Sequence, residues 1–87
     1  MKTIEENYML SNDPCEAISK ILELSLWGVD TTYLRNYLGV TSQKLNRYLH
    51  FIAQSGLAHV TKNYCRTTPH GVSYILDYQS LPKELKN

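Results

Sequence analysis

Three glycines set an upper limit on the length of the helices that this 87-residue chain can form. Each one follows a segment in which apolar residues recur at helical spacing, and glycine is favoured just past the end of a helix. The chain therefore predicts several short helices rather than one long one. The three expected stops are Gly28, Gly39 and Gly56.

Capping residues show where these helices should begin. Aspartate and threonine side chains accept hydrogen bonds from the free N–H groups of a first helical turn. Proline after the first cap suits the first helical position. The expected caps are Asp13 for a helix over about 14–27, Thr31 or Thr32 for a helix of about two turns, and Thr41 for a helix over about 42–55.

The residue types that follow Gly56 favour strands, and Lys62-Asn63 can supply a tight turn between them. We expect a hairpin with strands at about 57–61 and 64–67. Thr68 as the cap and Pro69 at the first helical position then predict a last helix over about 69–80, which ends before Pro82. The residues expected to face inward on that helix are Val72, Ile75, Leu76 and Tyr78.

The length and the order of these elements predict one small α+β domain that is mostly helical. The order is α-α-α-β-β-α, with a short strand at 29–31 before the second helix. The turn "LGVT" joins the second and third helices, which is the spacing of a helix-turn-helix motif. We expect the domain to span 13–81, between an N-terminal tail (1–12) and a C-terminal tail (82–87).

This arrangement resembles the winged helix-turn-helix domain, and in particular the small archaeal winged-helix proteins. The likeness covers about 14–80 and is carried by Leu45, Tyr48, Leu49, Ile52, Gly56, Leu57, Thr68 and Gly71. The resemblance implies binding of double-stranded DNA, with the third helix in the major groove and the hairpin beside it. Such proteins often pair through a long C-terminal helix, whereas Pro82 ends the last helix early here.

Charge is distributed unevenly along the chain. Residues 1–30 carry two lysines and six acidic side chains, a net charge of −4, whereas 31–76 carry five cations and no acid, a net charge of +5. Such asymmetry favours an anionic partner for the middle of the chain. No apolar run is long enough for a membrane span, and two glutamates stand where a signal peptide is apolar, so we expect a cytoplasmic protein.

Helical geometry places the apolar residues of the third helix on one side and its amide and basic residues on the other. Arginine and lysine can bind guanine edges, asparagine and glutamine can bind adenine edges, and a carboxylate would repel phosphate. The residues of this helix expected to bind DNA are Ser42, Gln43, Lys44, Asn46, Arg47 and His50. Those expected at the DNA backbone, from the second helix and the hairpin wing, are Thr32, Tyr33, Arg35, Lys62, Asn63 and Arg66.

The sequence therefore predicts a sequence-specific DNA-binding protein, a transcriptional regulator that acts as a homodimer on a two-fold site. A strip of Tyr74, Ile75 and Tyr78 is the candidate dimer contact, with packing inside the domain as the alternative. A second interpretation is a winged-helix module that binds an acidic protein partner, with Phe51 as anchor. We expect no enzyme activity, cofactor or metal, since no acid, base and nucleophile converge and Cys15 and Cys65 lie in no metal-binding pattern.

Overall fold

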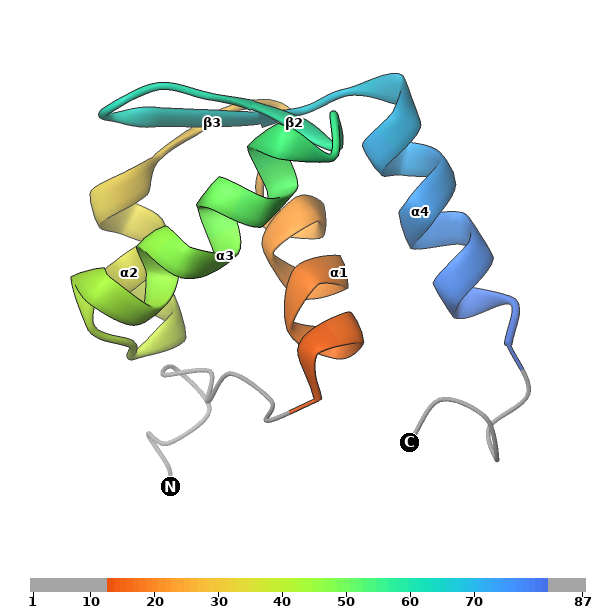
Figure 1. The fold of residues 1–87 in the computed structure, drawn as a ribbon, viewed down its shortest axis with the longest axis horizontal. Helices are drawn as coiled ribbons and strands as arrows, with labels where there is room; N and C mark the ends of the chain where they lie inside the picture. Colours follow the sequence, from red (N-terminus) through yellow and green to blue (C-terminus); the bar gives the residue numbers. More distant parts are fainter. Residues whose placement is uncertain (1–12, 82–87) are drawn as a thin grey trace.

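The computed structural model describes residues 13–81, and its helices gather beneath and beside a three-stranded sheet (Figure 1). The order of elements is that of a winged-helix domain, which confirms the predicted fold class. The expected tails, 1–12 and 82–87, lie outside the described residues. The elements are α1 (Pro14–Leu24), β1 (Val29–Asp30), α2 (Thr31–Leu38), α3 (Ser42–Gln54), β2 (Ala58–Val60), β3 (Tyr64–Thr67) and α4 (Pro69–Gln79).

Three of the predicted caps are confirmed. The side chains of Asp13, Thr41 and Thr68 each accept a hydrogen bond of 3.1 Å from a backbone N–H in the first turn of α1, α3 and α4. The prediction for α2 is wrong, because Asp30 caps it by accepting a 2.7 Å hydrogen bond from the N–H of Thr32. Asp30 has extended backbone at the end of β1, and its carboxylate suits the positive end of the helix.

The end of α1 also differs from the prediction, because the helix ends at Leu24 rather than near residue 27. Ser25 is buried and donates two hydrogen bonds to the carbonyl oxygen of Ile21. One comes from its backbone N–H, and the other comes from its hydroxyl at 2.8 Å. The chain then turns at Gly28, which has a φ of 90°, and enters β1. The glycine does mark a turn, but the turn lies beyond the end of the helix.

The sheet has the order β1-β3-β2, and both pairs of strands are antiparallel. Cys65 lies at its centre, opposite Val29 of β1 and Val60 of β2. The side chain of Cys65 is fully buried. The short strand that the sequence suggested before the second helix is therefore real, and it completes the sheet on the side of β3 away from β2.

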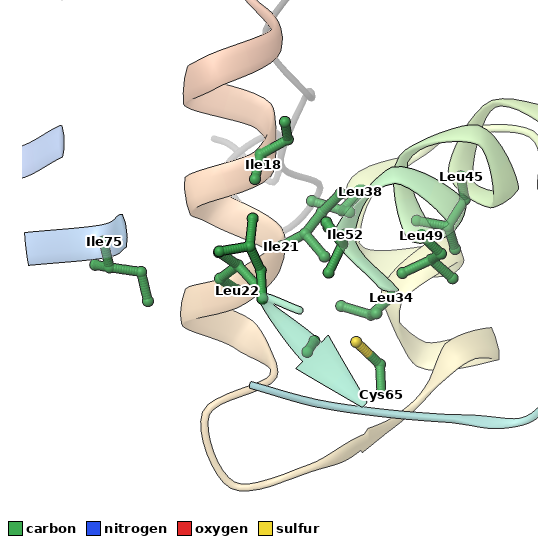
Figure 2. Packing of buried hydrophobic residues seen from close by; sticks show 12 residues of the cluster. Ile18, Ile21, Leu22, Leu34, Leu38, Leu45, Leu49, Ile52, Cys65 and Ile75 are labelled. Atoms are coloured by element: carbon green, nitrogen blue, oxygen red, sulfur yellow. The ribbon is translucent and has the colours of Figure 1, made fainter. Parts of the chain in front are cut away.

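The hydrophobic core lies between the sheet, α1 and the pair α2–α3. Figure 2 shows side chains of these three helices pointing toward one another, with the sulfur of Cys65 closing the cluster from the sheet. Ile75 of α4 reaches α1 from the side opposite α2 and α3. The largest fully buried hydrophobic side chains are Ile21, Leu22, Leu34, Leu38, Ile52 and Cys65.

The buried face of α4 is narrower than the sequence predicted. Ile75 is in the core, as expected, but Val72 and Leu76 are 37% and 57% exposed. Within residues 13–81 this helix packs chiefly on α1 and β3. A narrow stripe of Gly71, Ile75 and the half-buried Tyr78 therefore makes up its inward face. The expectation that Val72 and Leu76 face inward is therefore wrong.

Candidate nucleic-acid interface

The helix-turn-helix consists of α2, a three-residue turn and α3. Gly39 ends α2 with a φ of 65°, in the left-handed region that glycine adopts without strain, and its N–H returns to the carbonyl oxygen of Arg35 at 3.0 Å. Thr41 then caps α3. The Arg35 guanidinium also donates from Nη1 to Oγ of Ser42 at 3.4 Å, which links the two helices directly.

The hairpin tip is held against the start of α2 by Thr31. Its backbone N–H donates to the carbonyl oxygen of Asn63 at 3.0 Å, and its hydroxyl donates to the carbonyl oxygen of Lys62 at 3.3 Å. These bonds join residues about thirty positions apart in the chain. They bring the two residues predicted for the wing tip to the same edge of the molecule as the helix-turn-helix.

A polar cleft of about 320 Å³ lies between α2, the start of α3 and this hairpin tip. The two charged residues that line it within the described part of the chain, Arg35 and Lys62, are both cations. The predicted site residues that line it come from three separate elements and are Thr32, Arg35, Ser42, Asn46, Lys62 and Asn63. The structure therefore brings six of the twelve predicted DNA-binding residues together around one cavity.

The outer face of α3 has the division that the helical spacing predicted. Leu45, Leu49 and Ile52 are buried, and Tyr48 is half-buried against the core. Four of the predicted residues on the opposite face are exposed, namely Gln43, Asn46, Arg47 and His50. This face therefore offers amide, guanidinium and imidazole groups to a partner.

Three other predicted residues lie away from the cleft. Tyr33 stacks on Tyr37 of its own helix, with ring centroids 5.8 Å apart, and is still about half exposed. Arg66 is exposed on β3 and lines a separate hollow beside the start of α4. Lys44 lines a groove on the other flank of α3, together with Arg47.

The acidic side chains of the described region lie on elements other than α3. Glu16 and Glu23 are on α1, Asp77 is on α4, and Asp13 caps α1. Asp30, at the end of β1, accepts a hydrogen bond from the N–H of Thr32 at the start of α2. The helix α3 itself therefore carries basic side chains and no acid.

The groove beside Lys44 and Arg47 is a feature that sequence reasoning missed. It has a volume of about 680 Å³ and lies between α1, α3 and α4. Besides the two cations, its lining consists of Pro14, Cys15, Ile18, Tyr48, Phe51 and Tyr74. The available signal was Phe51, an aromatic residue on the polar side of an amphipathic helix, whose side chain is 50% exposed.

The candidate dimer strip packs largely within the domain. Ile75 belongs to the hydrophobic core, which excludes it as an exposed contact. The hydroxyl of Tyr74 donates to the carbonyl oxygen of Cys15 at 3.5 Å. Partial burial, together with the nearby side chain of Cys15, raises the pKa of Tyr74 to about 12. The apolar residues that α4 leaves exposed are Val72 and Leu76 instead.

Across residues 13–81, no three histidine, cysteine or acidic side chains cluster in a way that could hold a metal ion. Both cysteines are free thiols, Cys15 exposed and Cys65 buried. No helix in the described part of the chain is long and apolar enough to cross a membrane.

Comparisons of the chain with protein-family models, curated proteins and solved structures find no match. The class of the molecule consequently follows from its own architecture, a small, mostly helical α+β domain with winged-helix order.

Proposed function

We propose that this protein binds double-stranded DNA in a sequence-specific manner and regulates transcription. In this proposal α3 lies in the major groove and the β2–β3 hairpin acts as a wing. The observation that carries it is the exposed, acid-free face of α3 beside a cleft whose two charged lining residues are cations. Phosphate groups bind cations and the N-termini of helices. The amide, guanidinium and imidazole groups that α3 presents can form hydrogen bonds with base edges.

The residues of α3 and those of the cleft have different roles in this proposal. Gln43, Asn46, Arg47 and His50 on the exposed face read base edges. Arg35 and Lys62 bind backbone phosphates, with the polar groups of Thr32, Ser42 and Asn63 around them. Base contacts give specificity, whereas the phosphate contacts fix orientation and add affinity that depends on salt.

A domain of this size covers only a short stretch of duplex, so we propose that a homodimer binds a two-fold site. We further propose that it acts in the cytoplasm. The alternative partner is an acidic protein, and the exposed Phe51 near Lys44 and Arg47 is the feature that favours it. Binding to duplex DNA separates the two proposals.

The test is a titration of the full chain with duplex DNA selected from a random library, at several salt concentrations. Phosphate contacts from Arg35 and Lys62 in the cleft, together with those proposed for Lys44 and Arg66 outside it, predict a slope of log affinity against log salt of about −3 to −4 for each domain. Absence of DNA binding at low salt would contradict the proposal. Retention of an acidic protein in its place would support the alternative.

Variants separate the two kinds of contact. Arg47→Ala should reduce discrimination between bases, whereas Lys62→Ala should weaken all sequences alike and make the salt slope shallower by about 1. Lys20→Ala is the charge-matched control, because Lys20 lies among α1 and α4 residues away from α3. If Lys20→Ala weakens binding as much as Lys62→Ala, the effect is one of net charge and the proposed interface is wrong.

A further inference from the structure

The groove between α1, α3 and α4 has the composition of a small-molecule site. Pockets that bind small ligands are mostly apolar and aromatic, with a few polar groups that fix orientation, and enclose about 300–1,000 Å³. This groove, at about 680 Å³, has aliphatic and aromatic residues over most of its described lining, and among residues 13–81 the charged groups that line it are Lys44 and Arg47.

The aromatic residues of the groove leave apolar surface in contact with water. Phe51 is 50% exposed, and both Tyr48 and Tyr74 are half-buried. A flat apolar ligand in the groove would remove part of this surface from water, which is favourable in proportion to the area buried. The hydroxyl of Tyr74 is neutral at physiological pH, as that of an ordinary tyrosine is, so it adds no negative charge to the groove.

The charge of the lining selects the sign of the ligand. Lys44 and Arg47 lie on α3, one helical turn apart, and no acidic residue of the described region lines the groove. Asp13 is close enough to affect the pKa of Tyr74, but it caps α1 and is not part of the lining. An anionic group is therefore favoured at the α3 side, with the apolar part of the ligand toward α1 and α4.

The size of the groove favours a small molecule over a protein. Eight residues of the described range 13–81 line it, whereas a stable protein interface takes about 20–30 residues from each partner. An arginine also binds a carboxylate through two parallel N–H bonds, which adds geometric selectivity.

We propose that this groove binds a small carboxylate with an aromatic body, and that its occupancy weakens DNA binding. The second part rests on the proposed function, because it requires that Lys44 and Arg47 also contact DNA. A carboxylate bound to these two cations competes with DNA for the same positive charges. By thermodynamic reciprocity, DNA must weaken the ligand by the same factor.

The groove is tested first in the absence of DNA. The isotopically labelled full chain is titrated with biphenyl-4-carboxylate and followed by backbone amide chemical shifts. Saturable shifts are expected around Cys15, Tyr48 and Phe51. The neutral biphenyl-4-carboxamide should bind about tenfold more weakly or worse, because it lacks the charge-assisted hydrogen bonds.

Two variants and a matched control locate the site. Phe51→Ser should weaken the carboxylate about tenfold through lost apolar contact, and Lys44→Ala combined with Arg47→Ala should do the same through lost charge. Leu76→Ser removes a side chain of similar exposure from α4 outside the groove and should change affinity by less than about twofold. Circular dichroism of each variant verifies that it is folded.

Three results would overturn the ligand site: no saturable shifts at millimolar ligand, equal affinity for the carboxamide, or an equal loss in Leu76→Ser. The coupling is measured separately, by titrating duplex DNA with and without saturating biphenyl-4-carboxylate. An increase of about tenfold in the DNA Kd is expected when the bound carboxylate occupies Lys44 and Arg47 and cancels one of their two positive charges, and an unchanged Kd overturns the coupling. If the ligand-free protein binds no DNA, the proposed function fails while the result for the groove stands.

Discussion

At Gly71, α4 lies close against the segments that precede it. A Cβ there would collide with the backbone carbonyl of Leu57 and with the methyl group of Thr67. The same junction is held by Thr68, whose hydroxyl donates to the carbonyl oxygen of Gly56 at 2.7 Å and whose N–H donates to that of Leu57 at 3.0 Å. Thr68 and Gly71 together fix the start of α4 against the end of α3.

Gly71→Ala should therefore lower the free energy of unfolding by about 2–3 kcal/mol, because the added methyl group meets backbone that cannot move freely. The measurement is urea unfolding followed by circular dichroism. Ser73→Ala, an exposed position on the same helix, is the control and should change stability by less than about 0.5 kcal/mol. Equal stabilities for the two variants would show that α4 can shift to accept a side chain at Gly71.

At the scale of the element, β1 and α2 meet at one residue. Asp30 pairs with Tyr64 across the sheet and caps α2 through its side chain. The next residue, Thr31, holds the hairpin tip. The strand, the helix and the wing therefore share one junction, and the cap at Asp30 supports all three.

Asp30→Ala should reduce the free energy of unfolding by about 1 kcal/mol through loss of the cap, whereas Asp30→Asn should cost only a few tenths. Thermal unfolding of both variants gives these values. Under the proposed function, Asp30→Asn should also bind duplex DNA more tightly, because it removes the carboxylate nearest the cleft. Equal destabilisation by Ala and Asn would mean that the charge of Asp30, rather than its capping hydrogen bond, stabilises α2.

The bounds of α3 and α4 could be predicted from the sequence because local chemistry sets them. Thr41 and Thr68 cap the starts of α3 and α4. A glycine or a proline follows the end of each helix within the same short segment. The outward turn of Leu76 could not be predicted, since neighbouring elements decide how wide a buried face must be. The same holds for the site, because the cleft depends on bonds from Thr31 to residues about thirty positions away.

At the scale of the whole molecule, the two cysteines lie in different environments, one at the surface and one in the core. Cys15 is exposed in the first turn of α1, and Cys65 is fully buried in the central strand. Burial raises the pKa of the Cys65 thiol, an effect that a hydrogen bond with Ser25 partly offsets. Thiolate is the reactive form, so Cys65 is protected both by lack of access and by its protonation.

The native full chain should therefore react rapidly with Ellman's reagent at one thiol, and at a second only as the domain unfolds. The rate of the slow phase should rise with urea in parallel with global unfolding. Cys15→Ser should abolish the fast phase and leave the slow one. Rapid reaction of both thiols in the native protein, with Cys15 present, would contradict the burial of Cys65 in the central strand.

The bonds from Thr31 to the hairpin tip have a consequence for recognition of nucleic acid. They connect the wing to the helix-turn-helix, so the distance between the wing tip and α3 is set before any partner arrives. A protein with a fixed span of this kind does not adjust to a duplex, so the duplex must adjust to the protein. Under the proposed function, base steps that bend or change groove width at low energetic cost would then be favoured, even at positions that no side chain touches.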